Sequence, residues 1–150
     1  MLEFEYLCDL KVEVGEIVTM GVGPLGERRI VPILGGTFEG PLMRGTVLPG
    51  GSDWQIVRTD GVLDVDARYA LKEERGGAIR VVSQGYRHGP PEVLAALGRG
   101  EEVDPATYFF RSVLRFETGA PELAFLNQTI AIAKAQRKAR QVLLTAYRVL

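Results

Sequence analysis

The sequence predicts an all-β protein, a single closed antiparallel β-barrel of about eight to ten strands with one short helix near residues 91–98. Three observations lead to this prediction. Apolar and polar residues alternate in run after run, glycine- and proline-rich turns separate these runs, and 150 residues suit one domain with a single core. We favour a barrel over a two-sheet sandwich because consecutive hairpins close naturally and leave no exposed sheet edge. The predicted domain spans residues 1–150.

The first predicted strand occupies the beginning of the chain. Acidic residues and a lysine dominate one of its faces, and the opposite face is apolar. This alternation predicts a long strand with one buried and one solvent-exposed face. The apolar face comprises Leu2, Phe4, Tyr6, Cys8, Leu10, Val12 and Val14.

Further strand-like runs follow at short intervals. The turn signals "PGGS", "TDG" and "ERGG" separate several of them. Each run is rich in β-branched or aromatic residues, or alternates between apolar and polar residues. The runs cover residues 28–34, 42–48, 53–58, 62–72, 78–86 and 108–118.

Two glycine-rich segments need a separate interpretation. Residues 21–26 match the G-x-G-x-x-G fingerprint of dinucleotide-binding proteins, which functions only between a strand and a helix. The following "ERRIVPIL" is β-branched and contains Pro32, so we expect a turn instead of a phosphate site. We expect the glycines of residues 35–41, "GGTFEGP", to permit bulges or tight barrel corners.

The second half of the chain contains the predicted helix and one ambiguous region. In "PPEVLAALGRG", Pro91 suits the first helical position, Glu92 suits the first turn, and Gly98 or Gly100 suits the stop. The last 25 or so residues lack glycine and proline, and their helix propensity is high. Apolar pairs around residues 130–132 and 142–144 favour two strands instead. Composition alone leaves both alternatives open.

Composition excludes several classes of function. A net charge of −1 argues against electrostatic binding of nucleic acid. One cysteine and one histidine cannot form an internal disulfide or an ordinary zinc site, so we expect neither a metal nor another cofactor. The N-terminus is acidic, unlike a signal peptide, and no apolar run reaches the length of a membrane helix. We therefore expect a cytoplasmic protein that has no membrane partner and forms a homodimer.

Five stretches of the sequence resemble a known family. They are "RRIVPILGGTFEGPLMRGTVLPGGSDWQ" (28–55), "DARYAL" (66–71), "GYRHGPPEVLAALGRGEEVDP" (85–105), "YFFRSVLRFETGAPELAFLN" (108–127) and the closing "AYRV". In this order they resemble the domain of unknown function 3237 family, also called uncharacterised protein family 0311, of bacteria and fungi. The resemblance implies a single antiparallel barrel and favours a C-terminal hairpin, but it supplies no reaction. Phe125 stands where family members usually have tryptophan, and the last turn lacks their usual glycine or proline.

Two residues are the candidates for acid/base catalysis. His88, the only histidine, lies in a loop before the predicted helix, whose positive end would favour a neutral imidazole able to act as a base. Alternatively, it only hydrogen-bonds its own turn. Asp53 precedes Trp54, the only tryptophan, and a carboxyl group against an indole can have a raised pKa. Alternatively, Asp53 caps the turn at Gly50 and Gly51.

A second group of residues forms the candidate substrate-binding set. Arg111 and Arg115 share a strand face and would bind an anionic group if that face lined the lumen, although alternation favours the opposite, aromatic face as the inner one. The other candidates place a carboxylate, an amide, phenols or an indole near the barrel mouth. They are Glu39, Asn127, Tyr86, Tyr108 and Trp54.

Three functional hypotheses follow from these residues. The first is a cofactor-independent enzyme of isomerase, cyclase, lyase or hydratase type, acting on a small, oxygenated, partly apolar substrate. The second is a non-catalytic, lipocalin-like protein that binds a small ligand in an apolar lumen. The third is an assembly module whose barrel is packed solid. The first is our leading hypothesis.

Overall fold

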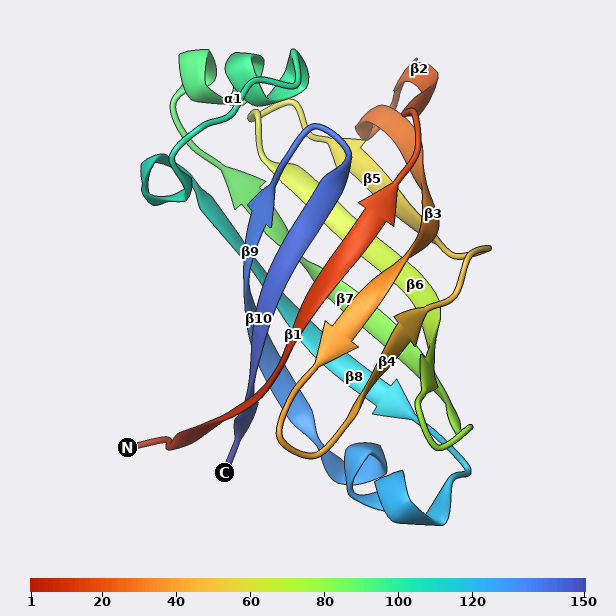
Figure 1. Cartoon of the computed structure of the whole chain (residues 1–150). Coiled ribbons are helices and arrows are strands. Elements are labelled where there is room, and N and C mark those ends of the chain that lie inside the picture. Colours follow the sequence, from red (N-terminus) through yellow and green to blue (C-terminus); the bar gives the residue numbers. More distant parts are fainter.

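The computed structural model describes residues 1–150 and contains ten strands, one α-helix and two 3₁₀-helices (Figure 1). The helical elements are α1 (Pro91–Gly98), η1 (Pro105–Thr107) and η2 (Pro121–Gln128). The strands are β1 (Phe4–Val14), β2 (Val18–Gly23), β3 (Gly26–Glu39), β4 (Arg44–Val47), β5 (Ser52–Val57), β6 (Leu63–Glu73), β7 (Ala78–His88), β8 (Phe109–Glu117), β9 (Ile130–Arg137) and β10 (Gln141–Val149).

The strands form a closed antiparallel barrel. The sheet runs in the order β1-β10-β9-β8-β7-β6-β4-β3-β2, and the additional pairing of β1 with β3 closes the ring. Strand β5 pairs with the beginning of β3 and with β6, while β4 pairs with the end of β3, so both bridge β3 and β6. Strand β2 extends the sheet beside β3. The predicted barrel, its strand number and its helix at residues 91–98 are confirmed.

Both glycine-rich segments have the roles expected from the sequence. Residues 21–26 end β2 and begin β3 through a tight turn, with no helix behind them to receive a phosphate. Gly36 has a φ of 134°, and a Cβ atom there would collide with the backbone carbonyl of Lys11. This close approach lets β3 leave β5 and pair with β1 along the same strand. Glycine is therefore what allows the barrel to close at this corner.

The first strand forms as predicted, but its apolar face is only partly buried. The register with β10 shifts between Tyr6 and Cys8, so Leu7 is an extra residue in a β-bulge. Leu7 and Cys8 are both buried, whereas Phe4 and Tyr6 are 53% and 40% exposed. The expectation that Leu2, Phe4 and Tyr6 lie on the buried face was wrong, because one inserted residue exchanges the two faces of a strand.

The C-terminal segment is a hairpin, as the family resemblance implied. Strands β9 and β10 pair in register from Arg137 opposite Val142 to Ala131 opposite Arg148. Ala131, Ala133 and Ala135 are almost fully buried at a spacing of two residues. Packing of these small side chains into the barrel outweighs the helix propensity of the segment.

The two ends of the barrel differ. Helix η2 covers one end, where Leu123 and Leu126 are fully buried (Figure 1). Helix α1 lies at the opposite end and contributes Leu97 to the core. No helix of the structure is long and apolar enough to cross a membrane.

Candidate functional site

A cavity occupies the lumen between the packed core and the α1 end. Its volume is about 50 Å³, several times the space needed for one water molecule, and 10 of its 16 lining residues are hydrophobic. The apolar wall comes mainly from strands β1, β3, β6, β8 and β10, through side chains such as Val12, Val31, Val65, Phe110 and Leu144. The remaining lining residues are polar or charged, which gives the cavity a chemical character unlike that of the core.

Asp53 projects into this cavity from β5. The alternation of β5 turns Asp53 and Gln55 inward and leaves Trp54 on the outside. The Gln55 Nε2 group donates a hydrogen bond of 2.8 Å to Asp53 Oδ2, and the backbone N–H of Asp66 donates one of 2.9 Å to Oδ1. Arg29 Nε donates to Gln55 Oε1 at 2.9 Å. Asp53 is thus held in one orientation by donors on two strands, β5 and β6, and Arg29 of β3 in turn orients the Gln55 amide.

The surroundings of Asp53 favour its protonated form. Burial raises the pKa of the Asp53 carboxyl, and the nearby Asp66 carboxylate acts in the same direction. The hydrogen bonds from Gln55 and from the Asp66 backbone oppose this change, as does the positive charge of Arg87, without cancelling it. A buried carboxyl group with a raised pKa is better suited than an ordinary one to accept a proton and then return it.

Three arginines converge at the same end of the lumen. Arg29, Arg87 and Arg137 project from β3, β7 and β9, and none of them forms an ion pair with a carboxylate. Burial lowers the pKa of Arg87 to about 10, and repulsion from Arg29 and Arg137 adds to the effect. Burial and the charge of Arg29 likewise lower the pKa of Arg137. The three guanidinium groups therefore share this end of the lumen without an ion-paired carboxylate, and Asp53 is the single acidic residue that lines the inner cavity.

Two buried polar atoms lack a hydrogen-bond partner, and both belong to side chains that line the cavity. They are the Tyr69 hydroxyl and Arg87 Nε. Their side chains are only 7% and 8% exposed. Unpartnered buried polar groups are rare in folded proteins because each loses its hydration without compensation. By contrast, the nearby Ser83 and Ser112 hydroxyls satisfy each other at 3.0 Å.

The cavity leads to a mouth that is also rich in arginine. Arg87 and Arg137 line both the inner cavity and this mouth. Arg29 lines the mouth, and Arg99 and Arg140 join it at the rim beside α1. Glu16 is the one acidic residue that lines the mouth. This concentration of positive charge contrasts with the net charge of −1 for the whole chain.

Of the sequence-predicted catalytic pair, the structure brings only Asp53 to the lumen. His88 is exposed on the outer face of β7, and its ring stacks on that of Phe109 with centroids 4.7 Å apart. Trp54 and Tyr86 are also on the outside, 44% and 48% exposed. The structure therefore does not bring the histidine and the aspartate together.

The remaining substrate-binding candidates lie away from the lumen or serve its frame. Arg111 lies on the outer face of β8, over the ring of Phe109, and Arg115 is exposed on the same face. Asn127 bonds the backbone N–H and C=O of Thr118 at 2.8 and 2.9 Å, which fastens the η2 segment. The buried Tyr108 hydroxyl accepts a hydrogen bond of 3.0 Å from the Arg137 backbone and so stabilises the wall beside the site.

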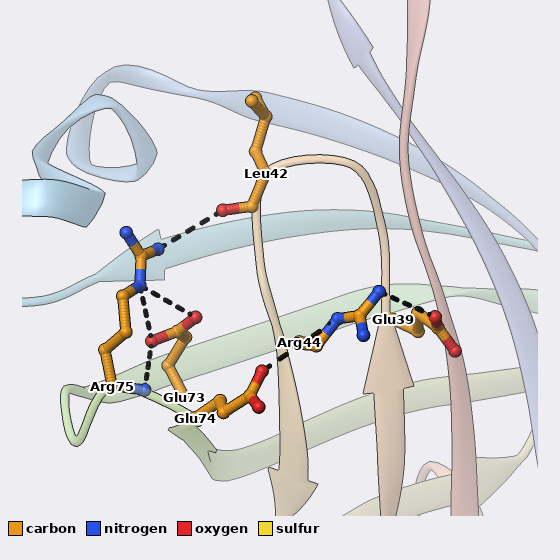
Figure 2. A network of polar contacts seen from close by, with 6 residues as sticks. All are labelled: Glu39, Leu42, Arg44, Glu73, Glu74 and Arg75. Atoms are coloured by element: carbon orange, nitrogen blue, oxygen red, sulfur yellow. Dashed lines mark hydrogen bonds and ion pairs between the residues drawn. The ribbon is translucent and has the colours of Figure 1, made fainter.

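Glu39 belongs to an ion-pair network at the turns that join β3 to β4 and β6 to β7, shown in Figure 2. Arg44 donates a hydrogen bond of 2.9 Å to Glu39 and approaches Glu74 at 4.0 Å. Arg75 contacts the buried Glu73 carboxylate at 3.1 Å and the Leu42 carbonyl at 3.4 Å. These contacts join neighbouring turns at the barrel end opposite α1, so the ion pair of Glu39 is part of the structural frame of the barrel (Figures 1 and 2).

Sequence reasoning missed Arg29, Arg87, Arg137 and Gln55. The sequence did contain a signal for Arg87. If the strand predicted at residues 78–86 is extended by two residues, Arg87 falls on the same face as Ile79 and Val81. The inward position of Arg87 also implies that His88 points outward. Arg137 fell in the region whose secondary structure was ambiguous, so its direction had no basis in sequence.

The residues of this chain are not arranged for metal binding or for thiol chemistry. No group of three or more histidine, cysteine, aspartate or glutamate side chains is placed to bind a metal ion. Cys8 is buried in the core, and burial raises the pKa of its thiol to about 12. The expected role of Cys8 as a core residue agrees with this position.

Comparison with known proteins places this barrel in a family. The family model described as "Protein of unknown function (DUF3237)" matches residues 2–149. The chain belongs to this family. A UPF0311 protein of Rhodopseudomonas palustris is 39% identical over 149 residues, covering 99% of this chain and 97% of that protein. A solved R. palustris structure from the family, of unknown function, has a TM-score of 0.95 at 39% identity and covers 100% of this chain and 98% of its own.

Two fungal relatives are more distant. The PR-toxin biosynthesis cluster protein 7 of Penicillium roqueforti is 25% identical over 150 residues, covering 86% of this chain and 80% of its own length. The solved structure of an enzyme from Penicillium herquei has a TM-score of 0.76 at 18% identity and covers 99% of this chain and 95% of its own. The latter similarity establishes a shared fold. The chain is therefore similar to bacterial proteins of unknown function and, more distantly, to a fungal protein named for a biosynthetic cluster.

Proposed function

We propose that this protein is a cofactor-independent enzyme that performs acid/base chemistry on a small, oxygenated, partly apolar molecule in the barrel lumen. The observation that carries the proposal is Asp53, an inward-facing carboxyl group with a raised pKa, held in place by Gln55 and by the backbone of Asp66. A positioned acid/base group of this kind suits isomerase, cyclase, lyase and hydratase reactions.

The residues around Asp53 suit a simple proton-transfer sequence. The Asp53 carboxylate takes a proton from a carbon next to a carbonyl group, and the electron pair moves to the carbonyl oxygen. The unpartnered Arg87 Nε and Tyr69 hydroxyl are donors available to stabilise this oxyanion. Asp53 then returns the proton to another atom of the substrate. Alternatively, Asp53 gives the proton to a β-hydroxyl group, which leaves as water while the enolate electron pair re-forms the carbonyl and a carbon–carbon double bond. No electron is gained or lost overall.

The relatives give modest support to an enzymatic role. A protein from a toxin biosynthesis cluster is similar to this chain in sequence, and an enzyme from Penicillium has the same fold. The alternative is a non-catalytic, lipocalin-like binding protein, which the apolar wall of the lumen favours. In that case a ligand would bind beside Asp53 and leave unchanged.

Exchange of carbon-bound protons with solvent tests the proposal. The protein is incubated in D₂O with 1,3-diketones, 2-oxo acids and aryl ketones, and loss of the α-proton signal is followed by NMR. We expect catalysed exchange that falls roughly a hundredfold or more in Asp53→Asn. Asp60→Asn is the matched control, because Asp60 is exposed and paired with Arg58 outside the lumen. Equal rates in the wild type and Asp53→Asn would contradict the proposal and favour the binding protein.

A further inference from the structure

We propose that the lumen binds an organic monoanion. Arg87 and its neighbours Arg29 and Arg137 hold the carboxylate-like oxyanion of this ligand, and the apolar wall holds its hydrocarbon part. This inference names the substrate class of the proposed enzyme, and so builds on that function. Binding itself requires no turnover, so the two can be tested separately.

The lumen holds more positive than negative charge. Arg29, Arg87 and Arg137 face one space, and no carboxylate lies within ion-pair distance of any of them. Asp53 is the one acidic residue that lines the inner cavity, and Glu16 the one that lines the mouth. Three mutually repelling guanidinium groups in a partly buried site are costly to fold. A bound anion would remove that cost, and the low dielectric of the lumen would strengthen the attraction.

The two unpartnered buried atoms indicate the chemistry of the ligand. Arg87 Nε and the Tyr69 hydroxyl are the only buried side-chain polar atoms of the chain that lack a partner, and both side chains line the same cavity. Both groups can donate a hydrogen bond, so a ligand that satisfies them must present acceptors. Carboxylate oxygens are strong acceptors, and their hydrogen bonds with guanidinium are charge-assisted.

The apolar wall of the lumen indicates what the rest of the ligand is. Ten of the 16 residues lining the inner cavity are hydrophobic, and the wall between the polar groups consists of side chains such as Val31, Val65 and Leu144. An inorganic anion would leave this wall without contacts. A carboxylate that carries an apolar body satisfies both parts of the site, and the small volume of about 50 Å³ restricts that body to a compact group.

The test compares acids with their neutral isosteres. Benzoate and hexanoate are titrated by calorimetry and NMR against benzamide and hexanamide, with inorganic phosphate as the arm for a purely inorganic anion. We expect each acid to bind roughly tenfold or more tightly than its amide, and phosphate to bind more weakly than benzoate. Equal affinity of acid and amide, stronger binding of phosphate, or no binding of either acid at millimolar concentration would overturn the inference.

Variants locate the binding and separate it from catalysis. Arg87→Gln should weaken benzoate binding roughly tenfold or more, and Arg137→Gln provides an independent variant if Arg87→Gln fails to fold. Arg111→Gln, on the outer face of β8, should bind as the wild type does. Asp53→Asn should bind benzoate more tightly, because it removes the only carboxylate of the inner cavity, while it loses proton exchange. Unchanged binding in both Arg87→Gln and Arg137→Gln would refute the site, whatever the exchange assay shows.

Discussion

Gln55 donates a hydrogen bond of 2.8 Å from its Nε2 group to Asp53 Oδ2, and both side chains point into the lumen from the same strand. The same amide accepts a hydrogen bond of 2.9 Å from Arg29 through its oxygen. The amide therefore connects a cationic residue to the candidate acid/base group without a direct ion pair. It fixes the orientation of the carboxyl group and moderates the effect of burial on its pKa.

Replacing Gln55 tests this coupling. In Gln55→Met the donor to Asp53 is lost while the side-chain length is kept, so the pKa of Asp53 should rise further above its ordinary value, because the Gln55 hydrogen bond lowers it. The titration is measured by carbon-detected NMR of the aspartate carboxyl groups. Gln84→Met is the matched control, since Gln84 donates a comparable bond of 3.2 Å to Asp66 on the outer face. A lowered pKa of Asp53 in Gln55→Met would contradict the coupling.

Asp53 should also make stability depend on pH. Its folded-state pKa lies above the ordinary value of 3.8, so the folded protein holds the proton more strongly than the unfolded chain. Stability is therefore lost as pH rises from about 4 through the folded-state pKa, and is constant above it. Asp53→Asn lacks this contribution.

The measurement is urea unfolding of both proteins from acidic to neutral pH. The free energy of unfolding of Asp53→Asn should improve relative to the wild type as pH rises across this window. The difference in unfolding free energy between the two proteins could instead stay constant or shift in favour of the wild type as pH rises. Either result would show that burial does not dominate the pKa of Asp53.

The barrel end that η2 covers should contribute much of the stability of the fold. Leu126 of η2 is fully buried, so Leu126→Ala should lower the free energy of unfolding by roughly 2–5 kcal/mol. Leu25→Ala, in the exposed turn between β2 and β3, should change it by about 0.5 kcal/mol or less. Urea denaturation measures both values. Similar small effects in the two variants would mean that η2 is not an integral part of the core.

The outward position of His88 predicts a variant with little functional effect. His88→Ala loses the stacking on Phe109, at a cost of about 0.5–1.5 kcal/mol in unfolding free energy. Proton exchange and benzoate binding should match the wild type, because the ring does not face the lumen. Loss of exchange in a folded His88→Ala variant would argue against a site centred on Asp53.

The sequence was informative about the strands and much less so about the direction of individual side chains. Alternation and turn signals located most of the strands and the helix, since these patterns arise from local geometry. The bulge at Leu7 exchanged the faces at the start of β1, and nothing in the local pattern indicates one extra residue. Short runs such as β5 contain too few residues to assign an inner face from sequence.

The candidate site illustrates the same limit. Asp53 was selected for its neighbours in sequence, Trp54 and the glycine turn. Its actual partners are Gln55 on the same strand and the Asp66 backbone on an adjacent strand, with Arg29 bonded to Gln55 behind them. Arg87 was passed over beside the more conspicuous His88. A cluster assembled across the closed sheet from several strands depends on barrel closure and register, which a single sequence does not specify.

The central claim is that the lumen holds a desolvated carboxyl group fit for proton transfer. Its most direct test is the carbon-detected NMR titration of the Asp53 side chain in the wild-type protein, with the resonance assigned by its absence in Asp53→Asn. We predict a midpoint above the ordinary value of 3.8. A midpoint at or below 3.8 would contradict the account, because the carboxyl group would then be stabilised as an anion and poorly suited to return a proton.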